Sequence, residues 1–299
     1  MEHFRRKQVR VLGLDTRVPD GPAPDEFSQL DVCDPRLLDI LREFAPDTVI
    51  HGAFIVTPLR DKREMRRVNV DGTKHVLDVM DRIRPARVML ISSATAYGAW
   101  PDNPQPMDED WPLRSRPGFP YAADKTEVEG LIDRFAQQCS DVAVSCVRPS
   151  IIGGPSMDNY IRRVLFGMPF LIRMDGHDQP FQLVHERDVV GAIDAILQAN
   201  GRGAYNVAPP DWTYTSDIAR DTGRWMIWLP FFFVRFVYGL GWQLRLPYPE
   251  TPAGFLYFAR YPWLVNPQRL EQEVGYQFEY STSETLAEIL QTRQAKNIR

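Results

Sequence analysis

Two side chains capable of acid–base chemistry, Tyr121 and Lys125, stand four residues apart in a predicted helix. Residues with this spacing lie on one face of a helix, so the phenol and the ammonium can reach the same cleft. A nearby cation favours the phenolate and lowers a phenol's pKa, which suits proton transfer to or from an alcohol or a carbonyl. Ser93, at the end of a predicted strand over residues 87–93, can hydrogen-bond the same substrate oxygen. The three residues together suit hydride-transfer chemistry at a secondary alcohol or ketone.

A tyrosine and a lysine four residues apart also occur in helices without a catalytic role, so the pair alone is ambiguous. Its surroundings favour the catalytic interpretation, because a Ser92-Ser93 strand end precedes it and an Arg148-Pro149 strand end follows it. With these motifs in this order and spacing, the chain resembles the extended short-chain dehydrogenase/reductases of the NAD-dependent epimerase/dehydratase type. The resemblance covers the chain from about residue 9 to about residue 290.

The resemblance implies an α/β fold, namely a Rossmann-type doubly wound parallel sheet with a smaller C-terminal substrate-binding lobe. Residues 1–155 would form the dinucleotide-binding region, to which later segments return, and residues 156–299 would form mainly the substrate lobe. It also implies that Tyr121 is the catalytic acid/base, that Lys125 lowers its pKa and holds the nicotinamide ribose, and that Ser93 positions the substrate oxygen.

Two acids at predicted strand ends are candidates for binding the adenosine half of the cofactor. Asp15 ends a strand over residues 9–15, and in such folds this acid accepts hydrogen bonds from the ribose hydroxyls. An aspartate in a surface turn is the alternative. The charge of Asp15 would repel a ribose phosphate and therefore favours NAD, although Arg17 nearby keeps NADP open. Asp31 corresponds to the family's adenine-contacting acid after the third strand.

Two further segments would lie along the cofactor in this fold. Gly52 and Ala53 follow a buried strand, at a place where a larger side chain would collide with the dinucleotide. Ser150 and Ile151 belong to an Arg-Pro turn that, by the resemblance, flanks the nicotinamide. His51, which directly precedes Gly52, is expected to be a hydrogen-bonded core histidine rather than a catalyst.

The glycine-rich loop that this family places before its first helix is absent, since no Gly-x-x-Gly-x-x-Gly spacing occurs in the 299 residues. The glycines of such a loop let the backbone approach the cofactor pyrophosphate, and the following helix offers free N–H groups to it. The chain is therefore expected to begin inside that helix, with residues 3–8 as its last turn. The central strand of the sheet would be missing, and NAD would bind weakly.

The residues directly after Ser93 limit which reactions of this family are expected. Sugar-nucleotide 4,6-dehydratases carry an Asp-Glu pair there, because elimination of water needs its own acid and base, whereas this chain has Ala94 and Thr95. An NAD-dependent epimerase or dehydrogenase is therefore favoured over a dehydratase, and a sugar-nucleotide epimerase remains one alternative. The rival from another class is a non-catalytic binding or regulatory protein that kept the site residues.

Composition bears on partners and compartment. The chain has 35 Lys and Arg against 39 Asp and Glu, and the resulting net charge of −4 argues against a nucleic-acid partner. The three cysteines do not have the spacing of metal ligands, so no metal site is expected. They cannot all form disulfides, so a reducing, cytoplasmic compartment is expected. The basic start is not followed by an apolar stretch, so a signal peptide is not expected.

The least typical stretch, residues 225–242, is almost wholly aromatic and aliphatic apart from Arg235. Pro230, Gly239 and Gly241 interrupt it, so it is a poor candidate for a spanning helix, which needs about 20 apolar residues. Three interpretations remain: packing within the substrate lobe, a lining for a large apolar substrate, and peripheral contact with a membrane surface. The second favours a lipid, steroid or polyketide alcohol over a sugar nucleotide as the small-molecule substrate. A homodimer also stays open.

Other motifs indicate scaffold rather than chemistry. Asn69 is predicted to tie a helix to the sheet, and Asp188 is predicted to cap a helix at its N-terminus. Residues 281–284, with the sequence Ser-Thr-Ser-Glu, are predicted to form a capping box before the last helix.

Overall fold

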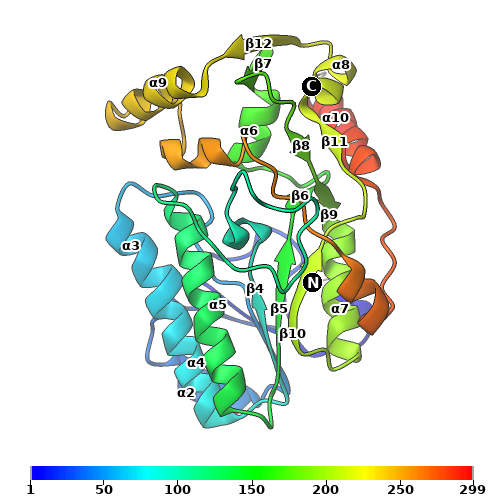
Figure 1. The fold of residues 1–299 in the computed structure, drawn as a ribbon. Helices are drawn as coiled ribbons and strands as arrows, with labels where there is room; N and C mark the ends of the chain where they lie inside the picture. The colour runs from blue at the N-terminus through cyan, green and yellow to red at the C-terminus, as the bar shows by residue number, and fades with distance from the viewer. Residues whose placement is uncertain (1, 298–299) are drawn as a thin grey trace.

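Buried apolar runs form the centre of the molecule, in strands β4 (Arg87–Ile91) and β5 (Ala143–Pro149). They belong to a four-stranded parallel sheet of order β10-β5-β4-β3, in which β3 is Thr48–His51 and β10 is Gly203–Val207. The computed structural model describes the backbone of residues 2–297 and the side chains of residues 3–163 and 167–292 (Figure 1). All seven residues of β5 are buried, as expected for a central strand covered on both faces.

Parallel strands need crossover connections, and here the crossover helices cover both faces of the sheet (Figure 1). α4 (Gly72–Ile83) and α5 (Pro120–Gln138) pack on one face, together with Val88 and Leu90 of β4. α7 (Glu186–Gln198) packs on the other face, where Met89 points. The alternation of side chains along β4 therefore serves two cores, and the predicted α/β class with a Rossmann-type parallel sheet is confirmed.

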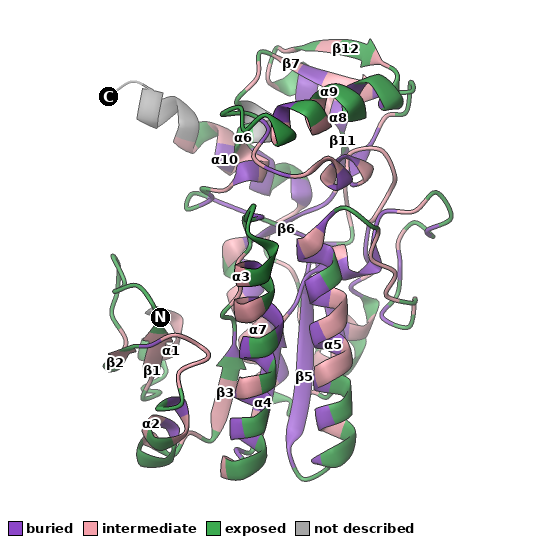
Figure 2. Cartoon of the chain, turned by 90° about the vertical axis from the view of Figure 1, so that its left-hand side faces the viewer, coloured by how far each residue is buried: buried purple, intermediate pink, exposed green. Residues whose placement is uncertain are grey.

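A second, two-stranded parallel sheet contains β1 (Leu12–Asp15) and β2 (Glu26–Gln29). Figure 2 shows this pair beside α2 (Leu37–Phe44) and set apart from β3. Leu12 and Leu14 still pack against the same apolar core as α2 and α4. Within residues 2–297 no strand pairs with both β1 and β3, so the sheet is divided at the position where the sequence predicts a missing central strand.

The smaller lobe lies beyond the carboxyl ends of the main strands (Figure 1). It contains three strand pairs: β6 (Ile151–Gly153) with β9 (Leu183–His185), β7 (Phe170–Met174) with β12 (Trp225–Leu229), and β8 (Pro180–Phe181) with β11 (Thr213–Tyr214). Its helices are α6 (Tyr160–Phe166), α8 (Thr215–Asp221), α9 (Phe231–Gln243), the 3-10 helix η3 (Ala253–Tyr257) and α10 (Thr282–Asn297). The short helices elsewhere are α1 (Glu2–Arg6), α3 (Lys62–Arg66), η1 (Arg67–Asp71), η2 (Ala94–Tyr97) and η4 (Leu270–Val274).

The capping-box prediction is confirmed, and Asn69 has the expected structural role, although it joins the loop after β3 to α5 rather than a helix to a strand. Asn69 is buried, its Oδ1 accepts a hydrogen bond from the Ile55 backbone at 2.7 Å, and its Nδ2 donates to the Asp124 carboxylate at 2.9 Å. The capping box forms before α10, because the Glu284 backbone N–H donates to Ser281 Oγ while the Ser281 N–H donates to the Glu284 carboxylate.

The prediction for Asp188 is wrong, since His185 is the N-cap of α7 and accepts a hydrogen bond from the Arg187 backbone. Asp188 lies buried within the first turn of the helix. Its carboxylate accepts hydrogen bonds from the Tyr276 hydroxyl and from the Glu279 backbone N–H, both at 2.8 Å. Asp188 therefore fastens the segment before α10 to α7 rather than capping its own helix.

Candidate active site

Helix α5 carries the Tyr121 and Lys125 side chains into the boundary between the two lobes. The helix begins at Pro120, whose missing N–H costs nothing at the first helical position. Tyr121 and Lys125 are both buried, and Lys125 Nζ lies 5.8 Å from the centre of the Tyr121 ring. The predicted pair therefore shares one helix face, as its spacing requires.

The groups around Lys125 fix the position of its ammonium, and its burial sets its pKa. Its Nζ donates a hydrogen bond to the Ile91 carbonyl at 2.7 Å and lies 3.5 Å from the centre of the Phe54 ring, a cation–π contact. Burial lowers the pKa of Lys125 to about 7, because the ammonium loses its hydration. The side chain is thus fixed at the carboxyl end of β4 and can carry or release a proton near neutral pH.

The pKa of Tyr121 differs from the sequence prediction. Burial raises this pKa to about 12, and a hydrogen bond with Ser93 opposes the rise. The predicted lowering by Lys125 is not found here, because the ammonium is engaged with the Ile91 carbonyl and the Phe54 ring while burial dominates. Tyr121 is therefore a neutral phenol near pH 7 and is suited to donate a proton.

Ser93 stands at the transition from β4 to η2 and has two roles. It is the N-cap of η2, and its Oγ accepts hydrogen bonds from the Thr95 backbone at 3.2 Å and from the Thr95 hydroxyl at 3.0 Å. The Ser93 hydroxyl also opposes the rise of the Tyr121 pKa, which places the third predicted residue beside the phenol. Ser93, Tyr121 and Lys125 therefore converge at the carboxyl end of β4.

Aromatic side chains surround the Tyr121 phenol. Phe54 meets the Tyr121 ring edge-on, with ring centres 5.6 Å apart, and the Phe119 ring centre lies 5.8 Å away. Phe119 in turn contacts Phe255 and Phe258 at 5.7 Å and 5.5 Å. This aromatic wall, Phe54, Phe119, Phe255 and Phe258, removes water from the phenol, which is the physical cause of its raised pKa.

Of the two acids predicted to bind adenosine, Asp15 is the last residue of β1 and Asp31 follows β2 by two residues. Asp15 is exposed, and its Oδ1 accepts a hydrogen bond from the Arg17 backbone at 2.9 Å. Asp31 pairs with Arg67 at 2.8 Å, and this hydrogen-bonded pair lowers the pKa of Asp31 to about 2. Asp15 is therefore open to solvent at the end of its strand, whereas the Asp31 carboxylate is already paired with Arg67.

The residues predicted to lie along the rest of the cofactor include two that are exposed to solvent and one whose hydroxyl lacks a hydrogen-bond partner in the part of the chain that the structure describes. Gly52 and Ala53 are exposed, and a Cβ built on Gly52 would come no closer than 3.7 Å to another atom, at Ile91. Ser150 Oγ is buried without a hydrogen-bond partner among the described residues, while Ile151 is buried and pairs with β9. An exposed acid for a ribose, open backbone at Gly52 and an unsatisfied hydroxyl at Ser150 fit a dinucleotide.

A buried polar network that the sequence analysis did not predict lies next to the strand end that carries Ser93. Arg148 pairs with Glu129 at 2.7 Å, and both side chains are almost wholly buried. Arg148 also donates to the Tyr97 hydroxyl at 2.6 Å, and Tyr97 donates to Asn206 Oδ1 at 2.9 Å. Since Ser92 Oγ donates to the same Glu129 carboxylate, the network fixes the strand end that carries Ser93.

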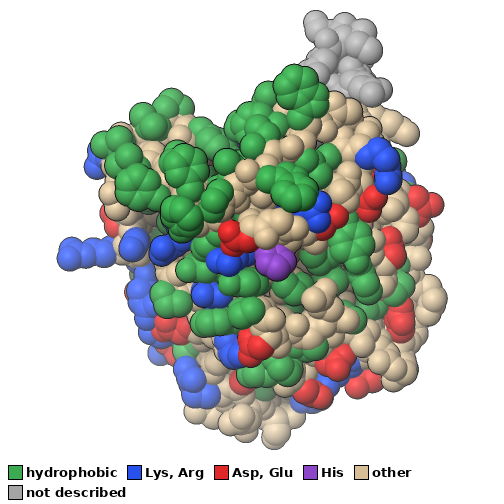
Figure 3. Space-filling model, turned by 45° about the horizontal axis from the view of Figure 1, so that its top comes forward, with side chains coloured by type: hydrophobic (Ala, Val, Ile, Leu, Met, Phe, Trp, Pro, Cys, Tyr) green, Lys and Arg blue, Asp and Glu red, His purple; other side chains and the backbone are tan. Residues whose placement is uncertain are grey.

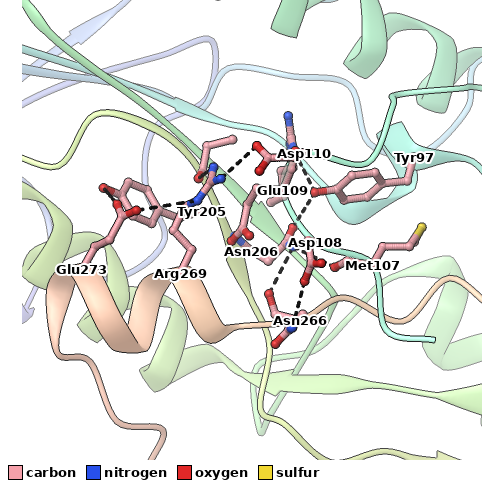
Figure 4. A network of polar contacts seen from close by, with 12 residues as sticks. Tyr97, Met107, Asp108, Glu109, Asp110, Tyr205, Asn206, Asn266, Arg269 and Glu273 are labelled. Atoms are coloured by element: carbon pink, nitrogen blue, oxygen red, sulfur yellow. Dashed lines mark hydrogen bonds and ion pairs between the residues drawn. The ribbon is translucent and has the colours of Figure 1, made fainter. Parts of the chain in front are cut away.

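The same network fastens the loop after η2 to the far side of the sheet. Figure 4 shows this loop, with Glu109 accepting a hydrogen bond from the Asn206 backbone at 2.8 Å. Asp108 accepts from Asn266 at 2.8 Å, and Asp110 pairs with Arg269 at 2.9 Å. The loop beside the site is thus tied to β10 and to the segment before η4.

Comparison with known proteins gives one family and one fold. The model of the "NAD dependent epimerase/dehydratase family" matches residues 1–208. An uncharacterised protein of Mycobacterium tuberculosis is 28% identical over 297 residues, which cover 95% of this chain and 77% of that protein. The UDP-glucose 4-epimerase of Mycolicibacterium smegmatis is 29% identical over 192 residues, which cover 59% of this chain and 58% of that enzyme. The structure of MoeE5 in complex with UDP-glucuronic acid and NAD superposes with a TM-score of 0.74 at 20% identity, covering 99% of this chain and 94% of MoeE5.

Proposed function

The chain belongs to the NAD dependent epimerase/dehydratase family, and from this premise we propose that it transfers a hydride between NAD and a secondary alcohol or ketone. The observation that carries the proposal is the convergence of Ser93, Tyr121 and Lys125 at the carboxyl end of β4. Ligands of open parallel α/β sheets bind at this edge, so a substrate placed there would face all three side chains.

The residues that would hold the cofactor fit its two ends. Asp15 would accept hydrogen bonds from the adenosine ribose, and Lys125 would hold the nicotinamide ribose. Gly52 would leave room for the dinucleotide, while Ser150 Oγ would gain the hydrogen-bond partner that it lacks in the described chain. NAD, when bound, accepts a hydride from the substrate carbon or returns it.

Tyr121 would move the proton that accompanies the hydride. In reduction the neutral phenol donates its proton to the carbonyl oxygen, which Ser93 holds by a hydrogen bond. In oxidation the phenolate accepts the proton of the alcohol, and this state needs a cation near the ring. Lys125, at 5.8 Å from the ring centre, is positioned to supply that charge.

The aromatic wall favours a substrate with an apolar face beside the reacting carbon. A sugar ring and a lipid-like alcohol both have such a face, so the wall alone supports either class. The most exposed side chains of residues 225–242, among them Trp225 and Phe232, face solvent, so they give no reason to prefer a lipid-like alcohol as the substrate.

A sugar-nucleotide epimerase is the second candidate, and the resemblance to a UDP-glucose 4-epimerase favours it. An epimerase uses the same two half-reactions, since it oxidises one carbon and returns the hydride to the opposite face. The same Tyr121 would first accept and then donate the proton. The two candidates therefore differ in net cofactor consumption rather than in the site residues.

One assay distinguishes these outcomes. The 299-residue chain is mixed with NAD and, separately, with UDP-glucose, UDP-galactose and an apolar secondary alcohol, while NADH absorbance and product chromatography are followed. Net NADH formation supports a dehydrogenase, and interconversion of the two sugar nucleotides without net NADH supports an epimerase. Calorimetry measures NAD binding in parallel. Binding of NAD without turnover of any of these substrates would contradict the proposal and favour the non-catalytic binding protein.

A further inference from the structure

The segment from β12 to the end of α9 exposes large apolar side chains to solvent. On β12, Trp225 is 80% exposed and Trp228 is 67% exposed. On α9, Phe232 is 75% exposed and Phe236 is 68% exposed. Single exposed apolar residues are common on proteins, but a contiguous patch of this size marks a binding surface.

The exposed side chains of α9 form one face of the helix. Helix α9 uses Phe231 and Val234 to pack against Met174 and Leu256, so its inner side is already occupied. The outer side consists of exposed apolar residues at helical spacing, namely Phe232, Phe233, Phe236, Val237, Leu240 and, just past the helix end, Leu244. Figure 3 shows the hydrophobic side chains gathered on this part of the molecule, with Lys and Arg side chains along one border.

The charged residues within this segment have one sign. Residues 222–249 contain Arg224, Arg235 and Arg245 but no Asp, Glu or Lys. Arg235 and Arg245 are exposed. Two further arginines make cation–π contacts with tryptophans of this segment. The Arg60 guanidinium lies 4.1 Å from the centre of the Trp242 ring, and the Arg173 guanidinium lies 5.1 Å from the centre of the Trp228 ring.

Two acids that border this segment, Asp175 and Glu250, pair with other arginines. Asp175 forms an ion pair with Arg260 at 2.6 Å and also accepts a hydrogen bond from the first backbone N–H of α9. Glu250 pairs with Arg163 at 2.5 Å. The face therefore combines aromatic rings and aliphatic side chains with the exposed arginines Arg235 and Arg245.

We propose that the face formed by β12 and α9 docks on the surface of an anionic phospholipid bilayer. Tryptophan and phenylalanine partition into the interfacial region of a bilayer, and arginines beside them attract anionic headgroups. A second copy of the chain is a poorer occupant, because a symmetric contact would bring two arginine-bearing faces together with no acids between them. Helix α9 would lie in the interface rather than cross it: within residues 2–297 no helix has the length and apolarity needed for a span.

Vesicle flotation tests this proposal directly. The full chain is mixed with vesicles of phosphatidylcholine alone or of phosphatidylcholine with phosphatidylglycerol, and the floated fraction is measured. We expect the chain to float with the mixed vesicles and to float several-fold less with phosphatidylcholine alone. Added salt should weaken binding to the mixed vesicles, because it screens the arginines.

Two variants and one control separate the contributions. The double variant Phe232→Ser/Phe236→Ser should lose at least tenfold in vesicle affinity, and Arg235→Gln/Arg245→Gln should lose the preference for anionic vesicles. The control, Val9→Ser/Val18→Ser, changes two exposed apolar residues on the other lobe and should float like the unchanged chain. Circular dichroism checks that each variant is folded.

Two results would overturn the proposal. One is failure of the folded chain to float with either vesicle composition. The other is flotation that the Phe232→Ser/Phe236→Ser variant retains in full. If the chain instead elutes as a dimer that this variant dissociates, and vesicles do not bind, the face is a contact between copies and the bilayer proposal is wrong.

Discussion

Burial controls the ionisation of the titratable residues around the candidate active site. It raises the pKa of Tyr121 and lowers those of Lys125 and His51, because each charged form loses hydration. His51 confirms the expectation of a core histidine: it is buried, and its Nε2 lies 2.9 Å from the Thr73 hydroxyl. A ring held neutral in this way makes stability depend on pH.

We predict that His51 destabilises the chain in acid. Burial lowers the pKa of His51 from its usual 6.5 to about 4, so the unfolded chain binds a proton more readily between these values. The contribution is fully present above pH 6.5 and is lost as pH falls toward 4. The free energy of unfolding should therefore drop by about 2 kcal/mol from pH 8 to pH 5 through this residue alone.

Urea unfolding of the chain and of His51→Gln at the two pH values measures this effect. The variant keeps a hydrogen-bonding side chain but does not titrate, so its loss of stability between pH 8 and pH 5 should be smaller by about 2 kcal/mol. An equal loss in both proteins would show that His51 is not responsible.

At the same scale, the chemistry of single residues was more predictable than their partners. Tyr121, Lys125 and Ser93 could be selected because their types and spacing have a chemical meaning. The ion pair of Arg148 and Glu129 could not, since no local pattern tells which of many acids a buried arginine will meet. The pKa of Tyr121 was mispredicted for the same reason, because burial by Phe54 and Phe119 depends on the tertiary structure.

At the scale of elements, the divided sheet has a consequence for local stability. β1 and β2 form a parallel pair with no further strand, and such a pair is marginal without packing on other elements. Only partly buried side chains, among them Leu12 and Leu14, attach β1 to the main core. In contrast, β4 and β5 lie inside the four-stranded sheet and are almost wholly buried.

We predict that hydrogen exchange distinguishes the two sheets. The backbone N–H groups of residues 12–15 and 26–29 should exchange through local opening, at least a hundredfold faster than those of residues 87–91 and 143–149. Exchange followed by mass spectrometry on peptides from both regions gives the comparison. Equal protection would mean that β1 and β2 open only when the whole chain unfolds.

Most helices and strands could be predicted from local patterns, because hydrophobic periodicity and helix capping depend on residues close together in the sequence. The capping box at Ser281 and the buried strand at β4 are examples. The prediction for Asp188 was wrong because an acid near the start of a helix can either cap that helix or bind groups elsewhere. The groups that donate to Asp188, the Tyr276 hydroxyl and the Glu279 N–H, lie about ninety residues away along the chain.

At the scale of the whole molecule, the family resemblance supplied what periodicity could not: the order of the strands and the lobe built above them. Pattern alone left three interpretations of residues 225–242 open. Which side of α9 faces Met174 and Leu256 and which side faces solvent is decided by how the lobe folds. Helix α9 packs on Leu256 of η3, and the adjacent Phe255 contacts Phe119 beside Tyr121. The variants proposed for the bilayer face change only exposed side chains of α9 and Arg245 just past it, and they leave these buried contacts in place.

The central claim is that Tyr121 moves the proton that accompanies hydride transfer, and one comparison of rates tests it most directly. With the substrate identified by the NADH and product assays, turnover is measured for the unchanged chain, for Tyr121→Phe and for Tyr205→Phe. Tyr205 is a buried tyrosine in β10 whose hydroxyl bonds to Glu273 at 3.2 Å, so it controls for loss of a phenol elsewhere. The account predicts a decrease of roughly 10² to 10⁴ in turnover for Tyr121→Phe, with unchanged circular dichroism, and a change of less than about threefold for Tyr205→Phe. A folded Tyr121→Phe variant that keeps most of its turnover would contradict it.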